Sequence, residues 1–258
     1  MVNAVADTWY MLGRLLRANW RQPIWVVVEL VQPAIWLILY GQLFRRVVEI
    51  PGFGAHSYIQ FLTPGVAVMT ALFGSAWAGM GLIEDFDRGV LDRLLTTPAS
   101  RPAIIVARVL NAGVAGGVQT LIIVAIGLAL GARVDAGPLG VLALLIVAIL
   151  LGSGFAAASN GIALLLRREE TFIAVLNFVT LPLTFLSASL MSTALMPRWM
   201  QVASRLNPVN WAVVGARAAV APFSAWAPLL PDVAWLVAFV IAMSAFATWA
   251  FVLYRRTT

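Results

Sequence analysis

The stretch EDFDRGVLDRLLTTPASRP, residues 84–102, is a compact charged segment between two long apolar stretches. It holds seven charged residues, three of them Arg and four acidic. As a helix, it has an apolar face that carries Val90, Leu91, Leu94 and Leu95. Pro98 disfavours helical backbone at Thr97, so this helix is expected to end there. The pattern predicts either docking into a groove of another protein or contact with the bilayer or bundle, and leaves the two level.

The composition around this segment is typical of a membrane protein. Of 258 residues, 62% are hydrophobic and only 11% are charged, with a mean hydropathy of +0.93. A soluble domain carries roughly a quarter charged residues. The chain therefore fits one bundle of several membrane spans rather than a soluble enzyme.

Six segments are apolar and long enough to cross a hydrocarbon core about 30 Å thick, which needs roughly 20 residues per helix. They cover residues 24–44, 59–83, 103–131, 139–166, 171–191 and 232–254. The predicted fold class is an all-α membrane protein with six transmembrane helices, in which residues 1–258 form a single transmembrane domain. Eleven of the 17 Arg residues fall on the side of the N-terminus, which favours cytoplasmic N- and C-termini. Arg45 and Arg46 argue against this orientation, because they directly follow the first span.

Residues 1–23 have the pattern of an amphipathic helix rather than of a span. One helical stripe consists of Val5, Trp9, Leu12, Leu16 and Trp20. The opposite face consists of Arg14, Arg17 and Arg21. This arrangement predicts an interfacial helix with its Trp side chains at headgroup depth and its Arg side chains toward anionic lipid. Its role is either membrane anchoring alone or also docking of a partner.

The last long loop separates the fifth and sixth spans by about 40 residues that are broken by five prolines. Pro197 is expected to open a short helix, and Asn207-Pro208 to end it and start another. Neither piece is long enough to span the membrane. They are predicted to be short helices at the outer face, re-entrant or interfacial.

The missing residue types exclude several kinds of chemistry. Without Cys there is no thiolate metal site, and the single His, His56, excludes HExxH. There is no Lys, so the chain has neither an intact Walker A motif nor Schiff-base chemistry. We therefore expect no catalytic site, cofactor or metal in this chain. The net charge of +6 is interpreted as membrane topology rather than nucleic-acid binding.

Two spans carry polar or aromatic stripes in otherwise apolar sequence. The first span has Gln32, Trp36 and Tyr40, and the fifth has Asn177, Thr180, Thr184 and Ser187. Such stripes face protein or a cavity rather than lipid. Packing is favoured for any single residue, and a substrate path for the stripe as a set. Glu29, near the inner end of the first span, is expected to pair with an inner Arg rather than to relay protons.

The segment at residues 84–110 closely resembles the motif E-x4-G-T-L-E-x-L-L-x-T-P-x-S-R of ABC-2 type export permeases of the daunorubicin-resistance-like group. The matching residues are Glu84, Gly89, Leu91, Leu94, Leu95, Thr97, Pro98, Ser100 and Arg101. Val90 and Asp92 depart from the motif, the second conservatively. NPVNWAVVGAR, residues 207–217, resembles the family's segment before the last span, a weaker signal. The resemblance covers essentially the whole chain.

This resemblance implies a transporter of two permeases, identical or homologous, and two separate ATP-binding subunits that hold ATP and Mg. The opening segment would be the coupling helix, with polar contacts from Glu84 and Arg88 and an apolar anchor of Leu91, Leu94 and Leu95 ended by Pro98. Spans one and five would line the route of a hydrophobic or amphipathic substrate, such as a drug, natural product or lipid. The expected location is the bacterial cytoplasmic membrane.

Two other classes of protein remain open from the sequence. A secondary transporter would carry paired intramembrane carboxylates or discontinuous spans at repeat-related positions, and neither is clear here. A non-transporting scaffold for an enzyme complex is distinguished by whether a complex with an ATPase shows substrate-stimulated hydrolysis.

Overall fold

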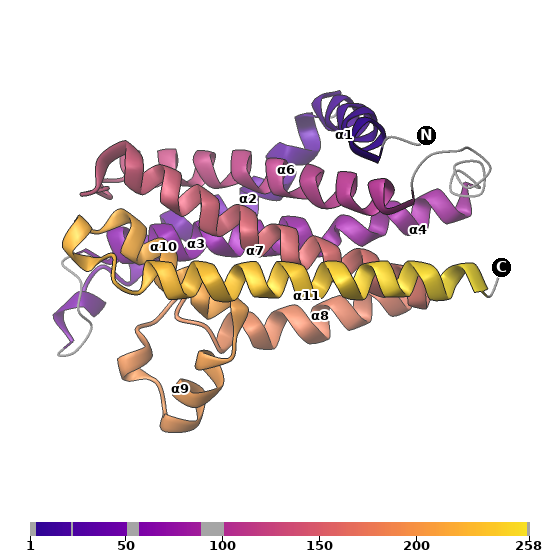
Figure 1. Ribbon diagram of the computed structural model, residues 1–258. Helices are drawn as coiled ribbons and strands as arrows, with labels where there is room; N and C mark the ends of the chain where they lie inside the picture. The colour runs from indigo at the N-terminus through magenta and orange to yellow at the C-terminus, as the bar shows by residue number, and fades with distance from the viewer. Residues whose placement is uncertain (1–3, 22, 51–56, 89–100, 257–258) are drawn as a thin grey trace.

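The structure is a computed structural model that describes residues 4–21, 23–50, 57–88 and 101–256. Every regular element in these residues is a helix, so the predicted all-α class is confirmed for them (Figure 1). The α-helices are α1 (Ala4–Trp20), α2 (Pro23–Leu43), α3 (Tyr58–Ala76), α4 (Met80–Asp87), α6 (Arg101–Ala129), α7 (Gly137–Leu166), α8 (Glu169–Phe185), α9 (Arg198–Arg205), α10 (Pro208–Val220) and α11 (Leu229–Arg256). The 3-10 helices are η1 (Val47–Glu49), η2 (Trp77–Gly79), η3 (Thr193–Leu195) and η4 (Phe223–Ala225).

Four helical segments of the described chain are long and apolar enough to cross a membrane. They are Tyr58–Phe86, Ala103–Ala129, Gly137–Leu166 and Leu229–Tyr254, at the positions predicted for spans two, three, four and six. Helices α2 and α8 lie where spans one and five were predicted. The apolar helix in α2, Val27–Leu43, is shorter than the four segments above. The structure thus supports a multi-pass membrane protein, and the count of six spans stays a prediction.

Helix α8 ends six residues before the predicted end of the fifth span, at Phe185 rather than residue 191. Its 17 residues rise only about 25 Å. Pro182 lies in its last turn, and the Leu186 N–H closes that turn on the Pro182 carbonyl. The chain then turns into the interior, where Ser187, Ala188 and Ser189 are buried. The apolar run after Phe185 therefore packs as a buried loop instead of continuing the helix.

Helix α7 is the centre of the bundle and packs against α3, α6, α10 and α11, which run along a common axis (Figure 1). Its small residues permit this packing. A Cβ at Gly154 would lie 2.5 Å from the Phe239 ring of α11, and one at Gly161 would lie 2.6 Å from the Phe246 ring. Glycine at residues 154 and 161 therefore permits the close contact of α7 with α11.

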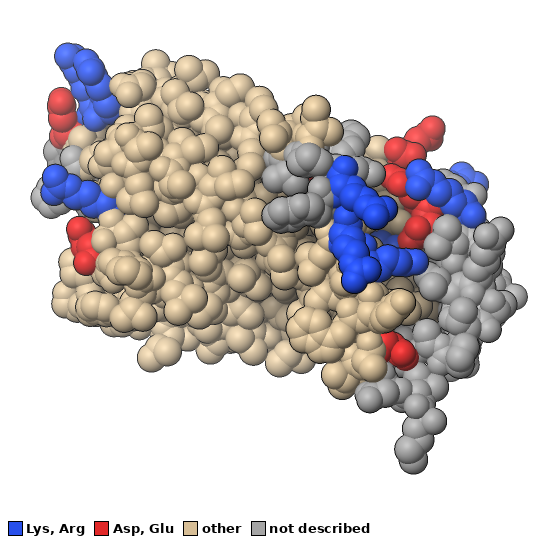
Figure 2. Space-filling view, turned by 90° about the horizontal axis from the view of Figure 1, so that it is seen from above, with Lys and Arg blue, Asp and Glu red and all other residues tan. Residues whose placement is uncertain are grey.

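Charged side chains gather at the two ends of the bundle and leave an apolar belt between them on the face shown in Figure 2. One end holds the ends of α4, α7 and α11, and the other holds the end of α2 and the starts of α3 and α7 (Figure 1). Arg88, Arg167 and Arg168 belong to the first end, and Arg45 and Arg133 to the second. These five Arg residues lie at the ends to which the predicted topology assigns them, and the orientation of the termini stays a prediction.

Helix α1 confirms the predicted N-terminal helix and crosses the bundle against α6 (Figure 1). Leu12 is buried, and Asn19 Nδ2 donates to Asn111 Oδ1 of α6 over 3.1 Å. Trp9 is 67% exposed, and Arg14 and Arg17 are exposed as well. Trp20 is the last residue of α1. Only part of the apolar stripe packs on the bundle, so the rest remains available to lipid or a partner.

The second predicted span is not one continuous α-helix, because η2 interrupts it between α3 and α4. Ser159 of α7 satisfies the backbone at this break. Its hydroxyl donates to the Ala76 carbonyl and accepts from the Gly79 N–H over 2.9 Å. A Cβ at Gly79 would lie 2.5 Å from the Ser159 carbonyl oxygen, so glycine is needed for this close approach.

The two short helices before α11 begin and end where the prolines predicted. Pro197 is the N-cap of α9. Asn207 caps α10 by accepting from the Val209 N–H over 2.9 Å, and Pro208 is the first residue of α10. Helix α10 is largely buried against α3, α7 and α11, whereas α9 projects from the bundle (Figure 1).

Side chains of the NPVNWAVVGAR segment, residues 207–217, form hydrogen bonds that connect α10 to the end of α8 and to the turn after it. Asn207 Nδ2 donates to the Leu183 carbonyl over 2.7 Å, and Asn210 Oδ1 accepts from the Ala188 N–H over 3.0 Å. Arg217 donates to the carbonyls of Ala188 (2.5 Å) and Ser189 (3.2 Å).

Arg217 also joins this turn to the start of α3. Its Nε donates to the Phe61 carbonyl over 3.2 Å, and its guanidinium carbon lies 3.5 Å from the centre of the Phe61 ring. One side chain thereby holds α10, the end of α8 and α3 together. The weaker of the two sequence motifs is a structural tie at this end of the bundle.

Replacing Arg217 by Met should lower the free energy of unfolding by about 3 kcal/mol, because three backbone carbonyls lose their donor. The measurement is denaturant unfolding of the purified protein in detergent. Arg198→Met, at an exposed position on α9, is the matched control and should stay within about 0.5 kcal/mol of the parent. Equal stability of the two variants would contradict this role of Arg217.

Candidate functional site

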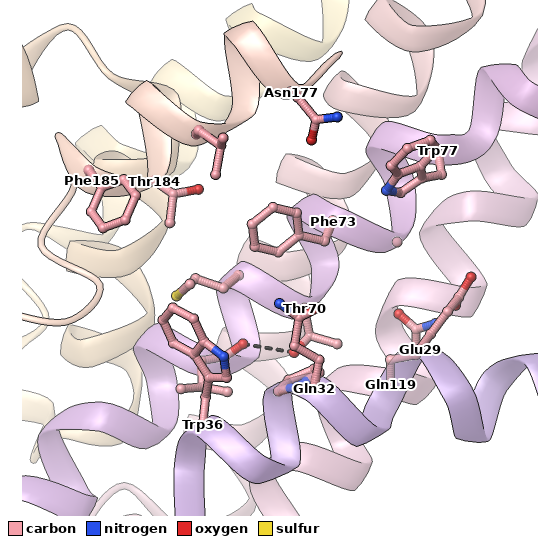
Figure 3. A pocket seen from close by; sticks show the side chains of 15 residues that line it. Glu29, Gln32, Trp36, Thr70, Phe73, Trp77, Gln119, Asn177, Thr184 and Phe185 are labelled. Carbon is pink, nitrogen blue, oxygen red and sulfur yellow. Dashed lines mark hydrogen bonds between the residues drawn. The ribbon is translucent and has the colours of Figure 1, made fainter. Parts of the chain in front are cut away.

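A cavity of about 340 Å³ lies between α2, α3, α6 and α8, in the half of the molecule that holds the predicted stripes (Figure 3). Its lining consists of Glu29, Gln32, Pro33, Trp36, Val66, Met69, Thr70, Phe73, Gly74, Trp77, Gln119, Asn177, Leu181, Thr184 and Phe185. This volume is within the range of small-molecule pockets. The lining is mostly apolar with a few polar groups, which is typical of a site for an amphipathic ligand.

Four aromatic side chains form much of the wall. Trp36 comes from α2, Phe73 from α3, Trp77 from η2 and Phe185 from the end of α8 (Figure 3). Trp36 is stacked on Tyr40, with ring centres 5.0 Å apart and an interplanar angle of 3°. The stacking holds Trp36 in place on the wall, and the cavity presents broad apolar surfaces from four separate elements.

The polar groups of the lining include a carboxylate and an amide that are bonded to each other. Glu29 Oε2 accepts from Gln119 Nε2 over 2.5 Å, across the interface of α2 and α6 (Figure 3). The prediction that Glu29 pairs with an inner Arg is wrong, because its partner is the neutral amide of Gln119. Gln119 and its neighbour Thr120 are polar residues within the apolar second half of α6, which is the signal that could have identified Gln119.

Hydroxyl groups on the wall are already bonded to backbone. Thr70 Oγ1 donates to the Val66 carbonyl over 2.8 Å, the bond drawn in Figure 3, and Thr184 Oγ1 donates to the Thr180 carbonyl over 2.8 Å. Bonds of this kind let a hydroxyl sit in an apolar helix without an unsatisfied donor.

The structure divides the predicted substrate stripes. Those that line the cavity are Gln32, Trp36, Asn177 and Thr184. Tyr40 lies one turn beyond, stacked on Trp36. Thr180 and Ser187 are buried and donate to the carbonyls of Leu176 and Thr184, both over 2.7 Å. These last two residues are not among the residues that line the cavity. The substrate path itself stays a prediction.

Sequence patterns missed the contribution of α3 and η2 to the cavity. Thr70, Phe73, Gly74 and Trp77 supply one wall, but this segment has no polar stripe of the kind found in α2 and α8. Its position follows from the packing of α3 against α2 and α6, which no pattern within a single span reveals.

The described part of the charged segment ends at Arg88. Glu84 and Arg88 form an exposed i,i+4 ion pair, with Oε2 and Nη2 3.4 Å apart, and a pair of this kind is worth little in stability. Asp85 pairs with Arg108 of α6, whose side chain is only 11% exposed, and this pair ties α4 to α6. Leu91, Leu94, Leu95 and Pro98 lie outside the described residues.

Residues 6–221 match the ABC-2 type transporter family. The chain belongs to the ABC-2 type transporter family. The matched region includes every cavity-lining residue and the charged segment, so both features belong to the family domain. The resemblance inferred from residues 84–110 and 207–217 is therefore confirmed.

Relatives of this ABC-2 permease are named for transport and drug resistance. A transport permease named ycf38 from Cyanophora paradoxa is 31% identical over 210 residues, which cover 81% of this chain and 72% of that protein. The daunorubicin resistance ABC transporter permease protein DrrB1 from Streptomyces coeruleorubidus is 28% identical over 214 residues, which cover 83% of this chain and 75% of that protein. The inner membrane transport permease YadH from Escherichia coli K12 is 29% identical, covering 75% of each.

Truncating Trp36 to Ala should enlarge the cavity and remove the stacking partner of Tyr40. We expect the apparent affinity for transported compounds to change by about tenfold in a size-dependent manner, with assembly intact. The measurement is uptake of a panel of amphipathic compounds of increasing size into inverted vesicles that contain the permease and its ATPase.

Trp249→Ala is the matched control, because Trp249 is exposed on α11 and does not line the cavity. It should leave the substrate range unchanged. An unchanged substrate range in the Trp36→Ala variant would indicate that Trp36 contributes only to helix packing.

Proposed function

We propose that this ABC-2 permease is the membrane subunit of an ATP-driven exporter that moves a hydrophobic or amphipathic compound out across the membrane. The observation that carries the proposal is the apolar cavity between α2, α3, α6 and α8, inside the matched family region. The names of the relatives, which include a daunorubicin resistance permease, support an amphipathic drug, natural product or lipid as the substrate class.

Energy must come from a second polypeptide, since this sequence has no Lys and therefore no intact Walker A motif. The proposed assembly has two permeases, identical or homologous, and two ATP-binding subunits that hold ATP and Mg. Residues 84–101 form the proposed docking segment. In its described part, α4 ends in the exposed pair Glu84 and Arg88, which is accessible to a partner.

The proposed location is the bacterial cytoplasmic membrane, with both termini and the α4 end of the bundle in the cytoplasm. The support is the unequal distribution of Arg between the two ends. Helices α2 and α8 then complete six spans, with α1 in the inner interface and α9 and α10 at the outer side.

The double substitution Leu91→Ala and Leu94→Ala should uncouple export from ATP hydrolysis. Each truncation removes several methylene equivalents from the proposed interface, worth about 0.8 kcal/mol per methylene. The fold should survive, because the spans satisfy their own backbone hydrogen bonds. The measurement is co-purification with the ATPase, together with ATP-dependent uptake into inverted vesicles.

Val237→Ala with Ile241→Ala is the matched double control, since both side chains are exposed on α11. It should retain the ATPase. Full ATPase association and export by the Leu91 and Leu94 variant would show that the segment is only a connector, and a complex without substrate-stimulated hydrolysis would favour a scaffold.

Cysteine labelling tests the orientation on a background that has no Cys. Glu170→Cys at the start of α8 and Ala194→Cys in η3 both occupy exposed positions. In intact cells an impermeant maleimide should label the cysteine at 194 and not the one at 170. Labelling of both from the same side would contradict the topology.

A further inference from the structure

The cavity lining carries an acidic side chain but no basic one, and this charge affects which compounds the cavity can bind. Glu29 is the single charged residue among its lining residues, and none of the lining residues is basic. Glu29 is exposed on the side of the cavity at α2. Within the hydrocarbon region of a membrane a carboxylate is costly unless a cation or several hydrogen bonds compensate it. Within the described residues Glu29 accepts a hydrogen bond from the neutral amide of Gln119, which compensates only part of this cost.

Gln119 holds the carboxylate at a defined position on the wall. Its Nε2 donates to Glu29 Oε2, and its side chain lies over Gly74 of α3. A Cβ at Gly74 would lie 2.8 Å from Gln119 Oε1, so the absence of a side chain at residue 74 leaves the room that the amide occupies. Three helices thus fix the acidic group: α2 carries it, α6 orients it and α3 makes room for the orienting amide.

The rest of the wall suits the body of an amphipathic cation. Trp36, Phe73 and Trp77 line the same cavity as Glu29 (Figure 3). Aromatic faces attract an ammonium group through their quadrupole, and they also bury an apolar body. A carboxylate and aromatic walls together match a protonated amine attached to an aromatic or aliphatic framework.

We propose that Glu29 is the residue that selects substrates carrying a protonated amine, and that Gln119 is its positioning residue. The inference rests on the proposed function, because it assigns the cavity as the substrate site. It gives the amine form of a compound an advantage over a neutral form of the same shape. It also predicts that an acidic analogue is rejected, since two carboxylates in an apolar cavity repel each other.

The test measures binding to the full-length permease in lipid nanodiscs, without ATPase or ATP. The probes are pyrenebutylamine, its neutral N-acetyl derivative and the acidic pyrenebutyrate. Binding is read from energy transfer between the tryptophans of the cavity wall and pyrene. The parent protein should bind the amine about 30-fold more tightly than the N-acetyl derivative, and pyrenebutyrate more weakly than either.

Glu29→Gln should bring the affinity for the amine down to that for the N-acetyl derivative and leave the latter within about twofold. Glu29→Asp keeps the charge and should keep a preference for the amine. Glu49→Gln is the matched control: it removes an exposed carboxylate in η1, outside the cavity lining, and should change neither affinity. Gln119→Leu should reduce the preference without abolishing it.

Several results would overturn the assignment: no preference for the amine in the parent protein, a preference that survives Glu29→Gln, an equal loss for both probes, or no binding of any probe. An equal loss would identify Glu29 as a structural or proton-carrying group. Failure of ATP-dependent export by the assembled transporter, with the amine preference intact, would instead contradict only the proposed function.

Discussion

The hydrocarbon of a bilayer provides no water to an open helix end, so each break in this bundle needs a side chain that replaces the lost backbone bonds. Two residues meet this constraint. Arg217 donates to three carbonyls around the end of α8 and the start of α3, and Ser159 bonds both sides of the break between α3 and α4. The early end of α8 and the interrupted second span both occur where these side chains supply backbone hydrogen bonds. Phe185 at the end of α8 and Trp77 at the break line the cavity.

The break at η2 also connects two parts of the molecule that would otherwise be separate. Trp77 of η2 lines the cavity, and α4 continues from the same break to Glu84 at the end of the bundle. The Asp85–Arg108 pair fixes α4 to α6, the helix that also carries Gln119. A displacement of α4 would therefore act on two walls of the cavity through direct contacts, which is the physical connection that a coupling segment requires.

The sequence predicted the features that depend on local chemistry. The apolar runs located four long spans, the prolines located α9 and α10, and the Trp and Arg spacing located α1. It did not predict features that depend on contacts between spans. The short α8, the η2 break and the partner of Glu29 are each determined by a residue far away in the chain, namely Arg217, Ser159 and Gln119.

In the candidate site, too, the sequence predicted what depends on the pattern within one helix and not what depends on contacts between helices. Periodicity identified Gln32, Trp36, Asn177 and Thr184, because each lies on a helical stripe with an unusual residue type. It could not separate them from Thr180, whose position on the stripe is equivalent but which does not line the cavity. The wall from α3 is apolar and gave no pattern at all.

The polar residues that hold the fold and those that offer polar groups to a ligand are largely different. Ser159 and Arg217 bond backbone away from the cavity, and the hydroxyls of Thr70 and Thr184 are occupied by carbonyls of their own helices. The other polar side chains on the wall are Glu29, Gln32, Gln119 and Asn177, of which Asn177 donates through Nδ2 to the Ile173 carbonyl and keeps its Oδ1 as an acceptor. Substitutions among these four change the chemistry of the cavity without opening a helix end. A fold of this kind can therefore change its substrate by small changes in one cavity, while the interactions that close its helix breaks stay in place.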